Sequence, residues 1–61
     1  MKIGDSVDLI YADGQRKIGV IREIHSDVVT ILVGGGEGHA TAMVNPKRLQ
    51  PVGPGRWRVD M

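Results

Sequence analysis

Polar and apolar positions alternate, or apolar residues form short runs, along most of this 61-residue chain. The first alternation runs from Ser6 to Tyr11, where Val7, Leu9 and Tyr11 share one parity. A period of two predicts a strand with one buried face. Between residues 19 and 33 the apolar side chains are nearly all β-branched, which favours strands because such side chains lose rotamer freedom in a helix. Turn-forming residues at positions 25–27 divide this run into a predicted hairpin.

Turn chemistry separates the remaining predicted strands. Asp13-Gly14 supplies the positive φ angles of a tight turn, and a second strand is expected over residues 16–24. In that strand Ile18, Val20 and Ile24 share one parity while Ile21 has the other, so a bulge or bend is predicted at Gly19. The third strand, about residues 27–33, ends at a glycine-rich loop over 34–38, and residues 39–44 are predicted as a fourth strand.

The end of the chain contains one short helical signal and one strong break. Asn45-Pro46 suits the start of a single 3₁₀ turn, after which Leu49 is expected in the core and residues 50–52 in a short last strand. No segment has helical periodicity, so the predicted class is all-β, a small antiparallel barrel. The predicted barrel spans residues 1–52, and residues 53–61 are expected to form a C-terminal tail or an extra edge strand.

The spacing of these residues resembles the KOW motif over about residues 4–33. The resemblance rests on Gly4-Asp5, Val7, Leu9, the segment Gly19-Val20-Ile21-Arg22-Glu23-Ile24 and the alternating strand from Val29 to Val33. Residues 44–49 are similar to the 3₁₀ turn and last strand of SH3-like barrels. The resemblance implies a five-stranded SH3-like antiparallel barrel with a 3₁₀ turn near residues 45–48. It also implies binding to RNA, DNA or partner proteins, as KOW domains do in ribosomal proteins and transcription elongation factors.

Charge is unevenly distributed, although the formal net charge is only +1. Six of the seven acidic residues precede residue 38, whereas no acidic residue lies between Pro46 and Val59. Cationic side chains neutralise phosphates, and an indole can stack on an unpaired base. The alternative for Trp57 is that it folds back to cover the barrel. The predicted nucleic-acid-binding residues are Arg16, Lys17, Lys47, Arg48, Arg56, Trp57 and Arg58.

Some apolar residues fall on the parity opposite the predicted core. Ile10, Val28 and Leu32 would form an interface for a partner or for self-association if they make a contiguous exposed patch. Strand bending would instead bury part of this surface. A protein-interaction or homo-oligomerising module is therefore the alternative to nucleic-acid binding.

Other chemistry finds little support in the sequence. There is no Cys, and the two histidines, His25 and His39, lack tight metal-ligand spacing, so neither a metal nor a cofactor is expected. No convincing Ser–His–Asp set supports nucleophilic catalysis, and the expected protein is not an enzyme; a small oligomeric enzyme is the third hypothesis. The apolar runs are too short to span a bilayer and no signal peptide is expected, so the predicted location is cytoplasmic.

Overall fold

The computed structural model describes the backbone of residues 1–35 and 38–61, and the side chains of these residues apart from positions 35, 38 and 39. The chain is all-β, as expected, with one 3₁₀ turn. In chain order the elements are β1 (Ser6–Ile10), β2 (Arg16–Ile24), β3 (Val29–Gly35), β4 (Gly38–Val44), η1 (Pro46–Arg48), β5 (Gln50–Gly53) and β6 (Arg56–Asp60). The middle of the predicted glycine-rich loop, residues 36–37, lies outside the described residues.

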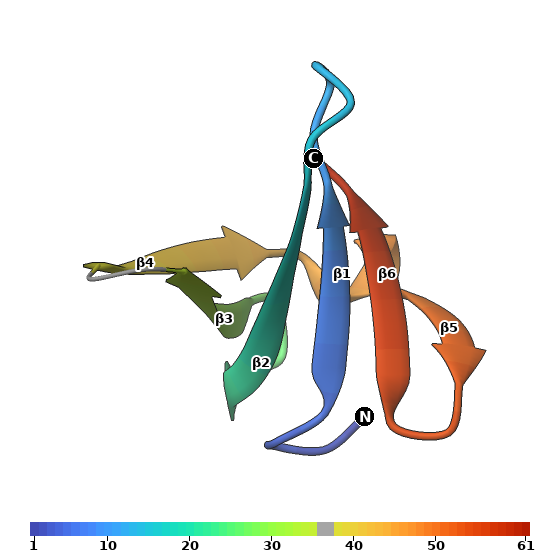
Figure 1. Cartoon of the computed structure of the whole chain (residues 1–61). Coiled ribbons are helices and arrows are strands. Elements are labelled where there is room, and N and C mark those ends of the chain that lie inside the picture. Colours follow the sequence, from blue (N-terminus) through green and yellow to red (C-terminus); the bar gives the residue numbers. More distant parts are fainter. Residues whose placement is uncertain (36–37) are drawn as a thin grey trace.

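The strands form one six-stranded sheet in the order β4-β3-β2-β1-β6-β5 (Figure 1). The sequence predicted a closed barrel of five antiparallel strands; the sheet is instead open, with β4 and β5 at its edges. One pair is parallel, since β1 and β6 run in the same direction. The physical reason is the turn at residues 53–55, which reverses the chain after β5 and inserts β6 between β5 and β1.

The segment expected as a tail or extra edge strand therefore contains an interior strand. β6 pairs with β1 from Ser6↔Arg56 to Ile10↔Asp60, and it pairs with β5 on its other side. The turn that makes this insertion possible includes Gly55, whose φ of 66° is a conformation that L side chains rarely adopt. The Met61 backbone N–H donates to the Ile10 carbonyl at 2.8 Å, so the pairing continues to the last residue.

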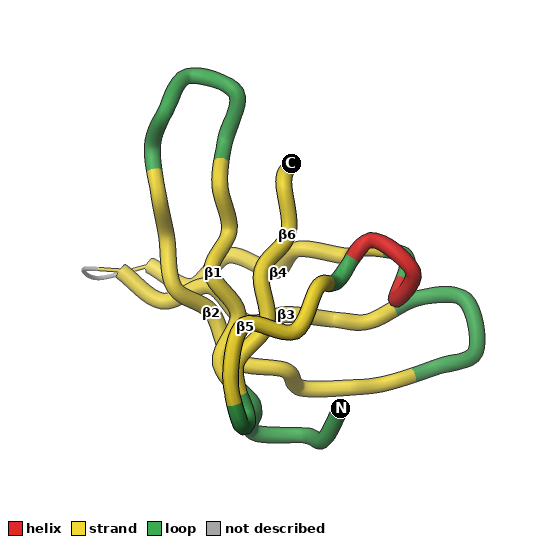
Figure 2. The backbone as a smooth tube through the Cα atoms, turned by 90° about the vertical axis from the view of Figure 1, so that its right-hand side faces the viewer, coloured by secondary structure: helices red, strands yellow, loops and turns green. Residues whose placement is uncertain are grey.

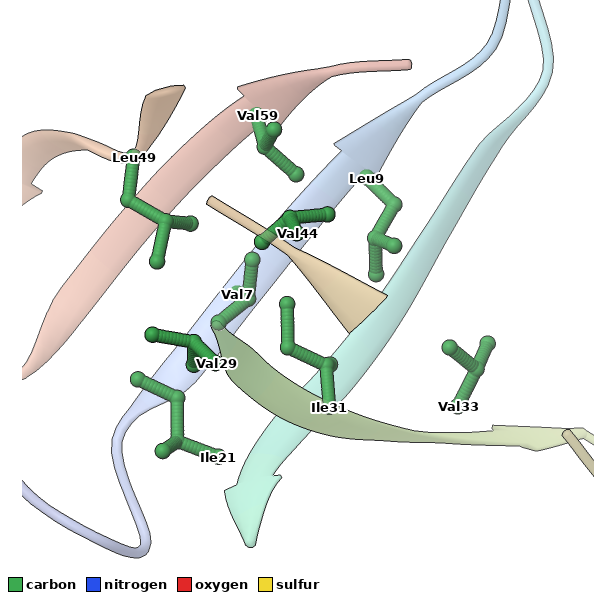
Figure 3. Close-up of a cluster of buried hydrophobic side chains, with 9 residues drawn as sticks. All are labelled: Val7, Leu9, Ile21, Val29, Ile31, Val33, Val44, Leu49 and Val59. Atoms are coloured by element: carbon green, nitrogen blue, oxygen red, sulfur yellow. The ribbon is translucent and has the colours of Figure 1, made fainter. Parts of the chain in front are cut away.

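The sheet bends so that β3 and β4 run across β1, β2 and β6 (Figure 1), and the core lies in the space between them. Figure 3 shows the buried side chains pointing into this space from both sides. The described core contains no charged or polar side chain. Its nine members are Val7, Leu9, Ile21, Val29, Ile31, Val33, Val44, Leu49 and Val59.

The broken alternation in β2 has a different cause from the one predicted. The register between β2 and β3 shifts between Ile21 and Glu23, so the bulge lies at Arg22 and not at Gly19. Ile21 is fully buried, whereas Ile18 is 66% exposed, so the core face of β2 is the parity that carries Gly19 and Ile21. Gly19 is buried, and a Cβ added there would lie 2.5 Å from Ile31 Cγ2. Glycine at this position therefore allows a close approach between β2 and β3.

The helical turn η1 was predicted at its observed position. Its first residue is Pro46, and the Asn45 side chain accepts a hydrogen bond from the Lys47 backbone N–H at 2.9 Å. This cap satisfies a donor that the turn leaves without a partner. η1 connects β4 to β5 (Figure 2) and places Leu49 in the core, where it is 6% exposed.

Candidate nucleic-acid interface

The outer face of β1, β2 and β6, which points away from the core, carries three of the six predicted basic residues, Arg16, Arg56 and Arg58. Val7 and Leu9 of β1 point inward, so Asp8 between them points outward. The register places Asp8 opposite Ile18 of β2 on one side and opposite Arg58 of β6 on the other. Arg56 has the same parity as Arg58 and shares this face. The pairing of β6 with β1 thus brings residues from both ends of the chain together.

Asp8 is the centre of one half of this surface. Its Oδ2 atom lies 3.4 Å from Arg56 Nη2 in an exposed ion pair. Around the pair is a shallow depression lined by Asp8, Arg16, Lys17, Ile18 and Arg56. Arg16 and Arg56, from two strands, share the outward face with this one carboxylate, so the cationic charge there exceeds the anionic charge. Lys17 is opposite the inward-pointing Leu9 in the register, so its side chain points to the core side of β2.

Asp60 is the centre of the other half. Its Oδ1 atom lies 3.4 Å from Arg58 Nη2, and its backbone carbonyl accepts a hydrogen bond from the Arg48 guanidinium. The sequence offered no spacing that required η1 and β6 to meet, yet these contacts bring Arg48 and Arg58 to the same residue. Asp60 is opposite Ile10 in the register, and Ile10 is opposite Arg16, so the two halves adjoin across β1.

We call the four cationic residues at these two carboxylates the basic cluster: Arg16, Arg48, Arg56 and Arg58. With Asp8 and Asp60 their formal charge is +2, and the other nine charged residues of the chain sum to −1, which together give the net +1. The cluster therefore carries more positive charge than the whole protein does.

Trp57, the predicted stacking residue, points to the opposite face. It is opposite Val7 in the register, is half-buried and packs against the core. Its Nε1–H donates to Asp5 Oδ2 at 3.0 Å, so the indole is in the folded-back arrangement that was the alternative to base stacking. Two hydrogen bonds lower the pKa of the Asp5 carboxyl below its usual 3.8. The larger effect comes from the Trp57 N–H and the smaller one from the Lys2 backbone N–H.

The two remaining predicted residues, Lys47 and Lys17, lie outside the basic cluster. Lys47 is on η1, exposed, and its printed contact is the backbone hydrogen bond to Asn45. Lys17 Nζ lies 5.5 Å from the centre of the Tyr11 ring, a cation–π distance. Sequence reasoning missed Tyr11, Asp8 and Asp60 as neighbours of the basic residues. The parity of Asp8 in its strand already indicated an outward side chain, but the position of Asp60 depends on the long-range pairing of β6.

The three residues predicted for an apolar interface are each only half-buried. Ile10 and Leu32 lie on the outer face and Val28 lies in the β2–β3 turn. The most exposed large apolar side chains on the outer face of β2 and β4 are instead Ile18 and Met43, each 66% exposed. The most exposed apolar side chains thus lie along the sheet from the predicted set, because Ile18 has the parity opposite to the buried Gly19 and Ile21.

Among the described residues, no group of three or more His, Cys, Asp or Glu side chains lies together in a way that would hold a metal ion. No helix within the described part of the chain is long and apolar enough to cross a membrane. Comparison with known proteins found no matching family model, no matching curated protein and no matching solved structure.

Proposed function

We propose that this protein is a non-catalytic nucleic-acid-binding module whose basic cluster contacts the phosphate backbone of RNA or DNA. The observation that carries the proposal is the convergence of four cationic side chains from β2, η1 and β6 on the surface around Asp8 and Asp60. In the sequence these residues are spread over positions 16 to 58.

Guanidinium and ammonium groups on a solvent-exposed sheet face suit phosphate oxygens because each contact releases a condensed counterion. Arg56 and Arg58 are exposed, and their ion pairs at 3.4 Å are of the weak surface type, worth between 0 and about 1 kcal/mol. Phosphates can therefore compete with Asp8 and Asp60 for these side chains at small cost.

The composition of the surface favours recognition of the backbone over recognition of base sequence. The Trp57 indole packs against the core with its N–H engaged by Asp5, and Lys17 lies over one face of the Tyr11 ring, so neither aromatic group is free to stack on a base. Phosphate contacts fix position without reading sequence. The proposed binding is thus tolerant of sequence and modest in affinity, in line with the small net charge.

The resemblance to KOW domains supports the same ligand class. The strongly bent sheet around a single core, with η1 before β5, is also consistent with a variant of the SH3-like barrel in which β6 separates β5 from β1. In this proposal the inserted strand β6 supplies Arg56 and Arg58, so the departure from five strands also builds part of the site.

The test is a titration of fluorescently labelled RNA and DNA, single- and double-stranded, followed by anisotropy at several salt concentrations. Log affinity should fall linearly with log salt, by about 0.9 per neutralised phosphate on a duplex and about 0.7 on a single strand. Arg56→Gln should weaken binding to all sequences alike and flatten the slope by roughly one unit.

The matched control is Arg22→Gln, which changes net charge by the same amount. Arg22 lies at the bulge near the other end of β2 from Arg16 and touches neither half of the basic cluster. Its loss should leave the salt slope unchanged. The proposal is wrong if no oligonucleotide binds at low salt, or if both substitutions weaken binding equally.

A further inference from the structure

The two edges of the sheet differ in how well they are protected from pairing with another strand. β5, at one edge, has four residues, contains Pro51 and is followed by Pro54. Short strands and proline are common protections, since proline has no N–H to offer a new neighbour. β4, at the other edge, spans seven residues and contains neither proline nor any Asp, Glu, Lys or Arg.

The hydrogen-bond pattern shows which backbone groups of β4 point to the free edge. The Ile21 N–H donates to the Asp5 carbonyl at 3.0 Å, so the backbone polar groups of Ile21 point away from its partner in β3, Ile31. In antiparallel sheets the direction of these groups alternates along a strand and between strands. Ile31 therefore turns its groups toward Ala42 of β4, and the next residues of β4, Thr41 and Met43, turn theirs outward.

The side chains near these groups present no barrier to a second strand. Ala40, Thr41 and Met43 are exposed, and all are uncharged. Thr41 pairs with Leu32, which pairs in turn with Val20, itself 42% exposed. An uncharged strip on the outer face thus runs from Val20 through Leu32 to Thr41 at the β4 edge, and a strand added there would extend it.

We propose that the β4 edge is a dimer interface, at which the segment Ala40–Met43 pairs antiparallel with the same segment of a second copy of this chain. An antiparallel pair of identical strands has two-fold symmetry, so each copy offers the same donors and acceptors. The neutral β4 meets no charge repulsion from its own copy. Because β5 at the other edge is short and protected by proline, the assembly ends at two copies and does not grow into a filament.

Sedimentation equilibrium of the full chain across micromolar to millimolar concentrations tests the proposal. The wild type should approach twice the monomer mass of 6.6 kDa as concentration rises. Thr41→Pro should keep the mass at the monomer value, since it removes an outward N–H and no bond to β3. Met43→Lys is a second variant that keeps every backbone donor and adds a charge to the edge.

The matched control is Val52→Lys, which places the same charge on β5, where Val52 is 50% exposed. This variant should dimerise like the wild type. A wild-type monomer at every concentration would overturn the proposal. A dimer that persists in both folded β4 variants, or that is lost in Val52→Lys alone, would also overturn it. Circular dichroism of each variant establishes that it is folded.

Discussion

At the scale of single residues, Gly19 shows how a packing constraint determines one position. A Cβ there would lie 2.5 Å from Ile31 Cγ2 and 3.0 Å from the Leu32 carbonyl oxygen. The second contact is with backbone, which cannot move aside as a side chain can. A bulge was predicted at Gly19 because the sequence cannot show this close approach; it shows only that a glycine interrupts the alternation.

We therefore expect Gly19→Ala to lower the free energy of unfolding by roughly 1–3 kcal/mol, as overpacking of a core does. Urea denaturation followed by circular dichroism measures this. Gly34→Ala is the control, because a Cβ at Gly34 meets nothing within 4 Å and its φ is not positive. Its stability should equal or slightly exceed that of the wild type. Equal stability of the two variants would remove the close-approach explanation.

Asp5 gives a second residue-scale prediction, through pH. Its pKa is lowered in the folded state, chiefly by the Trp57 hydrogen bond, so the ionised form is favoured by folding. The stabilisation is present above the ordinary pKa of 3.8 and is lost as pH falls through the lower, folded value. Asp5→Asn keeps an oxygen acceptor but not the charge. The stability difference between wild type and Asp5→Asn should therefore shrink on acidification from pH 6 toward pH 2.

Thermal unfolding at a series of pH values measures this difference. Trp57→Phe provides a partner variant, since it retains an aromatic ring against the core and loses the Nε1–H donor together with part of the indole. In this background Asp5→Asn should cost less than it does in the wild type, because the main cause of the lowered pKa is gone. A constant cost in both backgrounds would show that the indole and the carboxyl are not coupled.

At the scale of strands, local patterns predicted most elements, and long-range pairing accounts for the differences. The alternation of Val7 and Leu9, the β-branched run from 29 to 33 and the Asn45-Pro46 cap all indicated the observed β1, β3 and η1. Gly53-Pro54-Gly55 indicated a break in the chain, and the structure has a turn there. Whether β6 then lies outside β5 or between β5 and β1 depends on contacts with residues fifty positions away, which no local pattern contains.

The interior position of β6 leads to a prediction about truncation. A chain that ends at Gly53 loses Val59, which is 1% exposed, and the Trp57 ring, and it leaves β1 without one neighbour. Burial of one such apolar side chain contributes about 1.5–3 kcal/mol, a large share of the 5–15 kcal/mol that stabilises a typical domain. We expect the truncated chain to be unfolded by circular dichroism and NMR. A folded 1–53 fragment would show that residues 54–61 are a separable tail after all.

At the scale of the whole molecule, the charge distribution matters more than the total charge. The basic residues of the candidate site were visible in the sequence, since positions 46–59 contain no acid. Their convergence was not visible, because it depends on the parallel pairing of β1 with β6 and on Arg48 reaching the end of β6. The two carboxylates that moderate the site, Asp8 and Asp60, became part of it only through the same pairing.

This distribution predicts a gain in binding from the removal of one carboxylate. Asp8→Asn releases Arg56 from its ion pair and raises the formal charge around the basic cluster from +2 to +3. Affinity for RNA and DNA at low salt should rise several-fold, and the salt slope should steepen as Arg56 becomes free to contact a phosphate. The loss of the exposed ion pair should change stability by no more than about 1 kcal/mol.

Asp27→Asn is the control for that gain. It gives the same net charge of +2, but Asp27 lies in the turn between β2 and β3, at the end of the nine-residue strand β2 opposite to Arg16. Its affinity should stay close to that of the wild type, because at moderate salt the Debye length is about 10 Å and distant charges are screened. Anisotropy titrations of the three proteins compare them directly. An equal gain in both variants would show that the ligand responds to net charge alone, and a gain in neither would place the binding surface away from Asp8.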